Sequence, residues 1–185
     1  MVKLDRIYTG GGDEGETSLG DGTRVAKTSP MIAALGSVDE ANAAIGLVRL
    51  HVAAEIDAIL ERVQNDLFDV GADLCVPTTA SRNGLRMTDA QVAWVEHEID
   101  RVNEALPPLD SFVLPGGSVA SAHLHMARAI ARRAERDCVA VRDPAVSTPA
   151  LRYLNRLSDF LFVLARHTND DGRADVSWKP GAHRE

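Results

Sequence analysis

The feature that most constrains the fold is an apolar stripe that recurs every three or four positions between Ile56 and Leu74. At about 100° per residue, this spacing places the stripe along one face of an α-helix, whereas a half-buried strand would alternate. Its members are Ile56, Leu60, Val63, Leu67, Val70 and Leu74. The pattern predicts an amphipathic helix from about Ala53 to Cys75.

Four further segments have helical periodicity, and their ends show capping signals. Ser29-Pro30 can start the first helix, Thr88 and Gln91 can form a capping box, and Ser118 is a candidate N-cap. The expected helices span about 29–50, 53–75, 88–106, 118–141 and 148–169. Polar residues 77–86 separate the second and third helices, and Asp143-Pro144 ends the fourth. Five helices with mostly short connections imply an all-α, antiparallel five-helix bundle.

The chain length fits one domain over residues 1–185. It has 185 residues, of which 45% are hydrophobic, and only 4% are aromatic. Residues 1–28 are rich in Gly, Thr and Asp and are expected to form an ordered loop or a short extended segment. The bundle then occupies 29–169, and a polar tail follows at 170–185, in which Trp178 is a candidate to dock.

Charge and composition exclude several classes of function. The net charge of −7 argues against general nucleic-acid binding. No continuous apolar run approaches the ~20 residues of a membrane span, and the N-terminus lacks the apolar core of a signal peptide. The two cysteines, Cys75 and Cys138, are far apart and lack metal-ligand spacing. We therefore expect a cytoplasmic protein without a membrane segment, with both cysteines as small apolar residues.

Four arginines within nine residues stand out in this acidic chain. Arg128, Arg132 and Arg136 share one helix face with Glu135, whereas Arg133 points away from it. Small residues dominate the opposite side, so this helix can pack closely against its neighbours. Arginines four residues apart repel each other, so anionic partners must offset this repulsion. A ligand with several phosphates is suitable, because the planar guanidinium binds phosphate through two parallel hydrogen bonds. A solvated helix face with one salt bridge through Glu135 is the alternative.

A glycine-rich segment near the N-terminus is a second candidate site. Glycines allow backbone N–H groups to converge on a phosphate, and hydroxyl groups add donors. The segment contains Thr9, Gly10, Gly11, Gly12, Asp13, Gly15, Thr17 and Ser18, and Lys27 follows it. It is neither a Walker A motif nor a dinucleotide-binding fingerprint. A flexible glycine-rich terminus is the alternative.

Polar residues on otherwise apolar helices give three weaker signals. Asp39 needs a partner if it is buried, and the arginine-rich helix could supply one. Asn155 belongs to a polar patch on a leucine-rich helix, where an amide could bind an adenine edge or a ribose. Phe112 precedes Pro-Gly-Gly in a loop, either as a core plug or as a wall beside a ligand. His123 and His125 point about 200° apart on a helix, which argues against joint metal binding.

Six motifs in this order resemble the PduO-type ATP:cob(I)alamin adenosyltransferases, over about residues 5 to 168. They are the Ile7-Tyr-Thr…Gly-Asp-x-Gly-x-Thr-Ser-Leu loop, Gly36-Ser-Val-Asp-Glu-x-Asn42, Asp69-Val-Gly-Ala-Asp-Leu74, Phe112-Val-Leu-Pro-Gly-Gly117, Ala127-Arg-Ala-x-x-Arg-Arg-Ala-Glu-Arg136 and Tyr153-Leu-Asn-Arg-Leu-Ser-Asp-Phe-Leu-Phe162. The resemblance implies a helical bundle that assembles as a homotrimer with active sites between subunits. It also implies transfer of the 5′-deoxyadenosyl group from MgATP to cob(I)alamin, with release of triphosphate.

The resemblance assigns roles to individual residues. Those implied to bind ATP are Thr9, Gly10, Gly11, Gly12, Thr17, Ser18, Lys27, Arg132, Arg133, Glu135, Arg136 and Asn155. Arg132 is the expected triphosphate contact, Asp39 is the expected partner of Arg128 across a subunit interface, and Phe112 is expected to help displace the lower ligand of cobalamin. Mg²⁺ is expected to bind through the ATP phosphates. The implied partners are a flavoprotein reductase and an adenosylcobalamin-dependent mutase.

The chain departs from the family pattern in the glycine-rich loop. Gly10 and Gly11 replace the usual Lys and Thr, so a phosphate-facing cation is absent and more depends on Lys27. Met31 and Leu35 stand where the family often has Arg and Tyr. An alternative that follows from the missing Lys is a helical-bundle protein that binds a nucleotide or cobalamin for sensing or delivery and does not catalyse.

Overall fold

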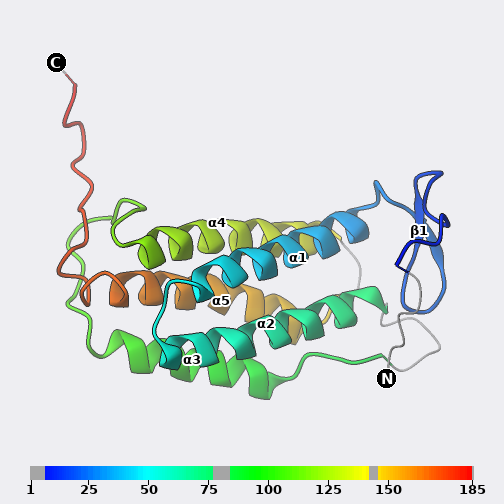
Figure 1. The fold of residues 1–185 in the computed structure, drawn as a ribbon, viewed down its shortest axis with the longest axis horizontal. Helices are drawn as coiled ribbons and strands as arrows, with labels where there is room; N and C mark the ends of the chain where they lie inside the picture. Colours follow the sequence, from blue (N-terminus) through cyan, green and yellow to red (C-terminus); the bar gives the residue numbers. More distant parts are fainter. Residues whose placement is uncertain (1–6, 77–83, 142–145, 185) are drawn as a thin grey trace.

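The computed structural model describes residues 7–76, 84–141 and 146–184, and it shows a helical bundle with a small β-hairpin (Figure 1). The described elements are β1 Glu16–Ser18, β2 Arg24–Ala26, α1 Pro30–Arg49, α2 Ala54–Cys75, α3 Asp89–Asn103, α4 Val119–Ala140 and α5 Thr148–His167. The predicted all-α bundle of five helices is therefore confirmed. The predicted helix break at Asp143-Pro144 and most of the 77–86 loop lie outside the described residues.

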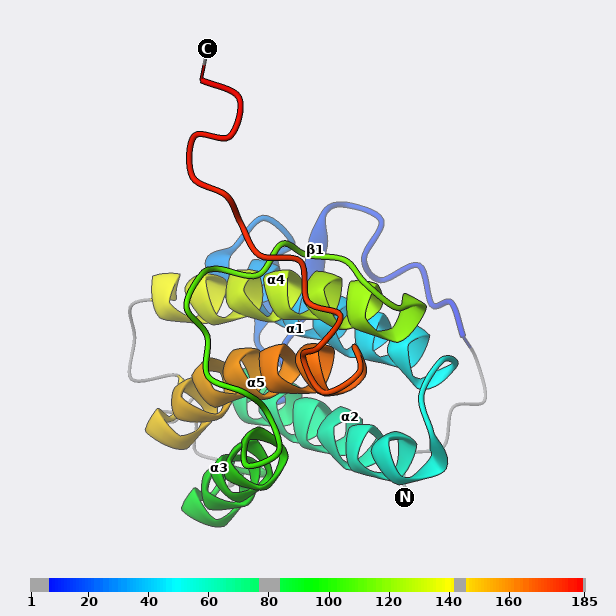
Figure 2. The ribbon, with the colours of Figure 1, turned by 90° about the vertical axis from the view of Figure 1, so that its left-hand side faces the viewer.

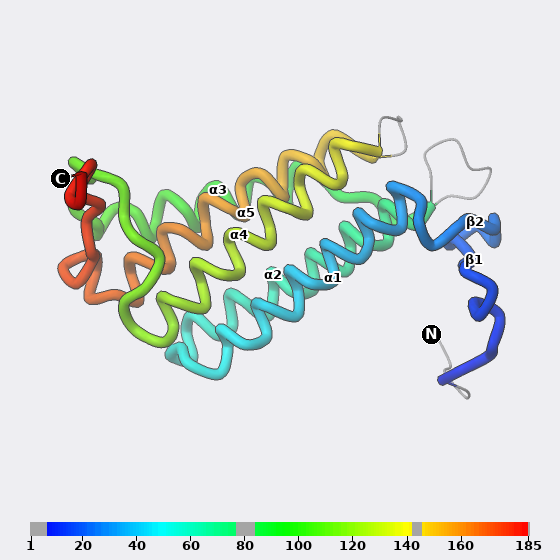
Figure 3. Tube along the Cα trace, turned by 90° about the horizontal axis from the view of Figure 1, so that it is seen from above, coloured from blue at the N-terminus to red at the C-terminus, as the bar shows by residue number. Residues whose placement is uncertain are grey.

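The helices form one continuous set of neighbours. α1 packs against both α2 and α4, α4 packs against α5, and α5 packs against α3. Along the chain the helices alternate in direction, as Figures 1 and 3 show. The β-hairpin lies beyond the end of the bundle where α1 begins, and the C-terminal tail leaves from the opposite end. The bundle thus separates the β-hairpin from the C-terminal tail.

The capping signals in the sequence mark three helix starts correctly. The Ser29 hydroxyl accepts from the Ile32 amide at 3.4 Å, and the Ser118 hydroxyl accepts from the Ser121 amide at 3.1 Å. Thr88 and Gln91 form the predicted capping box. One helix boundary was placed wrongly: α3 ends at Asn103 rather than near 106, because the chain leaves the helix in a turn. α5 begins at Thr148 as predicted, and the Ser147 hydroxyl caps it by accepting from the Ala150 amide.

Small residues on α4 allow close contact with α1 and α5. The alanines that face inward on α4 are fully or almost fully buried, as is Cys138. Burial raises the pKa of the Cys138 thiol to about 12, with a smaller contribution from the nearby Asp137 carboxylate. On α5 most of the helix circumference is buried, because α3 and α4 cover two sides of it. Cys75 is only half-buried, so the expectation for the two cysteines holds fully for Cys138.

The glycine-rich segment folds into an antiparallel hairpin, which agrees with the expected short extended structure. Thr17 pairs with Val25, and Glu16 and Ser18 pair with Ala26 and Arg24. Gly15 and Gly22 adopt φ values of 84° and 90°, which residues with a side chain rarely adopt. The tight turns around the hairpin therefore depend on glycine.

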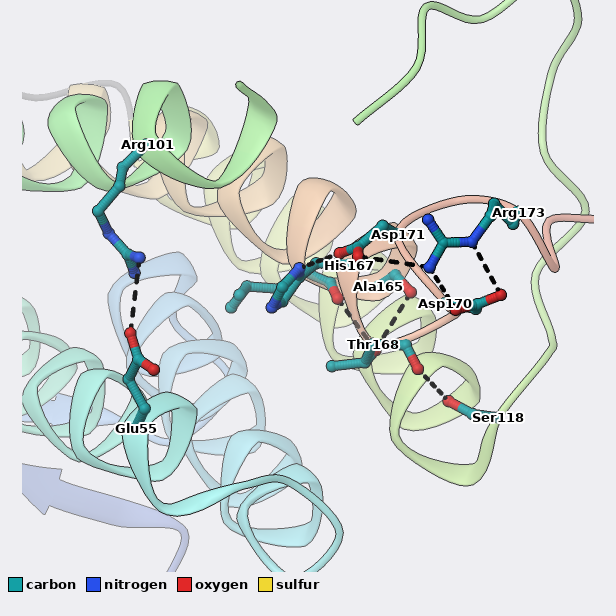
Figure 4. A network of polar contacts seen from close by, with 10 residues as sticks. Glu55, Arg101, Ser118, Ala165, His167, Thr168, Asp170, Asp171 and Arg173 are labelled. Carbon is teal, nitrogen blue, oxygen red and sulfur yellow. Dashed lines mark hydrogen bonds and ion pairs between the residues drawn. The ribbon is translucent and has the colours of Figure 1, made fainter. Parts of the chain in front are cut away.

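A buried ion pair ties the end of α5 to the segment that follows it, and a hydrogen bond from the same arginine reaches the loop before α4. Arg166 binds Asp175 at 2.8 Å and also donates to the Pro107 carbonyl at 2.8 Å. Nearby, the Ser118 hydroxyl donates to the Thr168 carbonyl at 2.9 Å, as Figure 4 shows. Asp170 and Asp171 follow in a left-handed turn, and each carries an ion pair of its own. This end of the bundle is therefore held by polar contacts between three chain segments.

The C-terminal tail lies along the 107–118 segment before it leaves the bundle (Figure 2). Val113 and Ser177 form an antiparallel bridge, and the Trp178 amide donates to the Phe112 carbonyl at 2.7 Å. Trp178 thus docks on the 107–118 segment, in line with its selection from the sequence.

One helix among the described residues, α1, is long and apolar enough in composition to span a membrane. Its apolar residues do not form a continuous run, because polar residues interrupt them. Its buried positions include Val38, Ala41 and Ile45, and they face the other helices. Core helices of soluble bundles pass the same test of length and composition.

Gly117 provides a test of how tightly the 107–118 segment is held. Its φ is 98°, and an added Cβ would lie 2.3 Å from Asn169 Oδ1, the atom that accepts from the Ser118 amide. We expect Gly117→Ala to lower the free energy of unfolding by about 1–3 kcal/mol, measured by urea denaturation. The control is Gly36→Ala, because Gly36 lies inside α1 with no atom near the added Cβ. Equal stability of the two variants would contradict this account.

Candidate functional site

The arginines of α4 form a cationic face that carboxylates in the described residues balance only in part. Arg132 and Arg136 are exposed, and the Arg136 guanidinium donates to the Arg132 carbonyl at 3.0 Å. Arg133 forms an ion pair with Glu40 of α1. Arg128, Arg132 and Arg136 have no ion pair with any described residue. The salt bridge through Glu135, which belongs to the alternative of a solvated helix face, is not found in the described parts of the chain.

Arg128 is the most constrained of the four. Its side chain is half-buried, and its Nε has no hydrogen-bond partner among the described residues. Burial lowers the pKa of Arg128, and the positive charge of Arg132 lowers it further. The guanidinium lies 5.9 Å from the centre of the Phe162 ring, which stabilises the cation only weakly. Arg128 therefore lacks the anionic partner that a buried cation requires.

Arg128 borders a cavity of about 560 Å³ at the end of the bundle that holds the tail. The cavity is lined by Leu109, Asp110, Ser111, Phe112, Val113, Arg128, Phe162, Trp178 and Pro180. Phe112 is 76% exposed, and its ring centre is 6.0 Å from that of Trp178. Of the two interpretations of Phe112, the wall of a ligand site fits this geometry, and the core plug does not.

A chain of hydrogen bonds joins two of the predicted nucleotide-binding residues. Asn155 Nδ2 on α5 donates to Glu135 Oε1 on α4 at 2.8 Å. Arg156 Nη1 donates to Asn155 Oδ1 at 2.7 Å, and Arg156 Nε donates to Glu96 Oε1 on α3 at 2.8 Å. The structure therefore places Asn155 beside the arginine-rich helix, as a shared nucleotide site requires.

The glycine-rich hairpin gathers two cations. The Lys27 ammonium lies beside Gly12: a Cβ atom added to Gly12 would be 3.0 Å from Lys27 Nζ. Arg24 donates to the Gly11 carbonyl at 2.8 Å and to the Ser18 hydroxyl at 3.3 Å. Thr9, Gly10 and Gly11 are exposed, and Thr17 is half-buried. Sequence reasoning missed Arg24, because only the hairpin register reveals that it lies opposite Ser18.

Asp39 does not meet Arg128 within the chain. It is exposed on α1 and lines a groove of about 370 Å³ between α1 and α2. Apolar side chains make up most of this groove, and Phe68 beside Asp39 is 70% exposed. An exposed carboxylate next to an uncovered aromatic ring is consistent with an interface to another molecule.

The predicted site residues fall into separate groups. The hairpin with Lys27 lies beyond one end of the bundle, and the segment with Phe112 lies at the other end (Figures 1 and 3). The arginines of α4 occupy the helix between these ends. One chain therefore does not bring the whole set together. Sequence reasoning also missed Arg156, although it follows Asn155 directly, because its contact with the Asn155 amide depends on how α3 and α5 pack.

The two histidines of α4 have different surroundings. His123 stacks on His51, with ring centres 5.3 Å apart. His125 is only 3% exposed, and its Nδ1 has no partner among the described residues. Burial lowers the pKa of His125, the Arg128 charge lowers it further, and Asp175 opposes these effects. No group of three or more His, Cys, Asp or Glu side chains suited to a metal ion occurs in the described residues.

Comparison with known proteins shows extensive similarity. The sequence profile of the family described as cobalamin adenosyltransferase matches residues 7–168. A corrinoid adenosyltransferase of Mycobacterium tuberculosis is 48% identical over 190 residues, which cover 99% of this chain and 97% of the relative. A cobalamin adenosyltransferase of Cupriavidus metallidurans is 43% identical, with 96% of each chain covered.

A solved structure shows the same similarity in three dimensions. It is a variant PduO-type ATP:corrinoid adenosyltransferase from Lactobacillus reuteri complexed with cobalamin and ATP. It matches this chain with a TM-score of 0.89 and 32% identity, and the match covers 94% of this chain and 99% of the other.

His125 makes the stability of the folded protein depend on pH. The unfolded chain takes up this proton near pH 6.5, and the folded chain takes it up only at lower pH. The unfolded state therefore binds more protons in this range, and the free energy of unfolding falls as the pH drops below about 6.5. We expect the loss of Tm between pH 7.5 and 5.5 to be smaller in His125→Gln than in the unmodified protein, by about 2–4 °C.

The control for this measurement is His97→Gln, because His97 is exposed on α3. That variant should keep the pH dependence of the unmodified protein. An unchanged dependence in His125→Gln would show that His125 is not buried as a neutral ring.

Proposed function

This chain belongs to the cobalamin adenosyltransferase family, and on that premise we propose that it transfers the 5′-deoxyadenosyl group of MgATP to cob(I)alamin. The cobalt(I) lone pair attacks C5′ of ATP, a Co–C bond forms, and the C5′–O bond breaks. Triphosphate leaves with that electron pair, and adenosylcobalamin is the product. Because cobalt(I) is itself the nucleophile, the protein needs to position the substrates and stabilise the leaving group.

The observation that carries this proposal is the set of unbalanced arginines on α4. In a chain of net charge −7, Arg128, Arg132 and Arg136 have no carboxylate partner among the described residues. Leaving triphosphate carries roughly four negative charges, and a cationic face held by the bundle stabilises them without reorganisation. We propose that Arg132 and Arg136 contact the triphosphate. Lys27, which follows the hairpin, then faces the phosphates from the hairpin side. Mg²⁺ enters with ATP and is held by its phosphates.

Phe112 and Arg128 mark the corrinoid side of the same site. Phe112 is exposed at the cavity of about 560 Å³, so a flat ligand can rest against its ring. In this position the aromatic ring takes the space of cobalamin's lower ligand. A four-coordinate cob(II)alamin is easier to reduce, and reduction then yields the cobalt(I) nucleophile.

We propose that the active sites lie between the subunits of a homotrimer. The buried Arg128 Nε lacks an acceptor among the described residues, and Asp39 is exposed beside an apolar groove. A neighbouring copy that covers this groove would bring its Arg128 to Asp39. The same arrangement would place the hairpin of one subunit against the arginines of the next.

We propose that the enzyme is cytoplasmic. The reaction consumes a reduced corrinoid, so we propose a flavoprotein reductase as the source of electrons. An adenosylcobalamin-dependent mutase is the proposed recipient of the product. A protein that only binds or delivers these ligands would form no adenosylcobalamin, and an adenosylation assay under reducing conditions therefore separates the two functions.

Arg132→Ala tests the role of the cationic face. We expect turnover to fall about 100-fold or more, because a preorganised charge on the leaving group is lost. Thermal unfolding should remain almost unchanged, because Arg132 is exposed and has no ion pair among the described residues. Arg101→Ala on α3 is the control, since it removes an exposed arginine from a different helix. Near-normal turnover in Arg132→Ala would refute the assignment.

Mixed trimers test the interface. Arg128→Ala and Asp39→Ala should each abolish most activity, because each breaks the pair at every interface. When the two variants are co-expressed, an interface regains the pair where Arg128 of one subunit meets Asp39 of the next. With random assembly, half times half gives about one intact interface in four, so about a quarter of the activity should return. A pair formed within one chain would never be restored by mixing.

A further inference from the structure

The Asn155 side-chain amide is held at both of its ends. Its nitrogen donates to the Glu135 carboxylate at 2.8 Å, and its oxygen accepts from the Arg156 guanidinium at 2.7 Å. A carboxylate can only accept hydrogen bonds, and a guanidinium can only donate them. A flipped amide would place oxygen against oxygen and nitrogen against nitrogen. The two neighbours therefore allow one orientation of Asn155.

Arg156 is itself held in place by a second contact. Its Nε donates to Glu96 on α3 at 2.8 Å, while its Nη1 reaches Asn155. The planar guanidinium makes both bonds at once, which a lysine ammonium on a flexible stem would not reproduce. The side chains of Arg156 and Glu96 are 37% and 39% exposed. The ion pair is thus partly shielded from solvent. It orients the Asn155 amide although neither Arg156 nor Glu96 is among the residues assigned to bind ATP.

The locked amide keeps one N–H donor and one oxygen lone pair free. This pair matches an adenine edge, on which an amino donor lies beside a ring-nitrogen acceptor. A hypoxanthine base has a carbonyl oxygen in place of the amino group, so that oxygen would face the Asn155 oxygen. A fixed amide rejects such a base more strongly than an amide that can turn over.

We propose that Arg156, oriented by Glu96, is a positioning residue that acts through Asn155 and sets the preference of the site for adenine nucleotides. This inference rests on the proposed function, because it takes Asn155 as a contact to the base of ATP. It adds a source of selectivity that lies outside the ligand contacts themselves.

The chain supplies a matched control one helical turn away. Arg152 of α5 pairs with Asp89 of α3 at 2.8 Å, and so it joins the same two helices. This pair is more exposed, and neither of its members is hydrogen-bonded to Asn155 in the described structure. Removal of either pair costs one α3–α5 ion pair, but only removal of Arg156 frees the Asn155 amide.

The experiment compares Arg156→Gln with Arg152→Gln, using ATP and inosine triphosphate as substrates for cob(I)alamin adenosylation. In Arg156→Gln we expect the KM for ATP to rise about tenfold and the ratio of kcat/KM for ATP to that for inosine triphosphate to fall about tenfold. Each change corresponds to about 1.4 kcal/mol. The KM for cob(I)alamin and the Tm should stay near those of the unmodified enzyme. Arg152→Gln should leave all four quantities unchanged.

Two further variants sharpen the result. Arg156→Lys should give intermediate selectivity, because an ammonium can bind Asn155 or Glu96 but does not hold both in one plane. Glu96→Gln should shift the ratio in the same direction as Arg156→Gln by a smaller factor. Asn155→Ala should raise the KM for ATP and remove most of the discrimination.

The inference is overturned if folded Arg156→Gln keeps the nucleotide ratio, if Arg152→Gln shifts it equally, or if Asn155→Ala leaves the KM for ATP unchanged. Failure of the proposed function gives a different result, because the unmodified enzyme would then form no adenosylcobalamin. In that case the dissociation constants of ATP and inosine triphosphate, measured by calorimetry for the same variants, test the positioning role independently of turnover.

Discussion

The close packing of α4 against α1 and α5 is the constraint on which the rest of the structure depends. From Ala127 to Cys138 the inner face of α4 carries only small residues, namely three alanines and Cys138, so the neighbouring helices approach closely and leave no room for an arginine there. The arginines must then occupy the remaining faces. One of them, Arg133, meets Glu40 on α1, whereas Arg132 and Arg136 remain available. Packing of small residues thus determines where the positive charge of the molecule gathers.

Helices and their caps could be predicted from the sequence because their signals are local. Apolar periodicity identified all five helices, and side-chain caps placed the starts of α1, α3 and α4. The hairpin was foreseen only as an extended segment, since its register depends on which residues meet across the turn. The end of α3 was misplaced because apolar periodicity continues to Leu106 beyond the last helical turn.

In the candidate site, too, local features could be predicted from the sequence and tertiary contacts could not. The residues that carry charge or polarity on one helix face were found from spacing, and the resemblance gave them roles. Their partners depend on tertiary packing and could not be found in this manner. Glu135 lies on the arginine face but is bonded to Asn155 of α5, and Arg156 is bonded to Glu96 of α3. Arg128 illustrates the limit most clearly, because its buried Nε lacks an acceptor among the described residues of its own chain.

Gly10 and Gly11 stand where the resemblance leads us to expect Lys and Thr, and other residues of the hairpin partly offset the change. In the proposed phosphate site, a lysine on the loop itself would face the phosphates directly, whereas two glycines carry no charge and add flexibility. Arg24 restores rigidity, because its guanidinium bonds the Gly11 carbonyl and Ser18 across the hairpin. Lys27 restores charge beside Gly12. In the proposed phosphate site, the cation therefore comes from Lys27, which follows β2, and Arg24 of β2 links the loop to the hairpin.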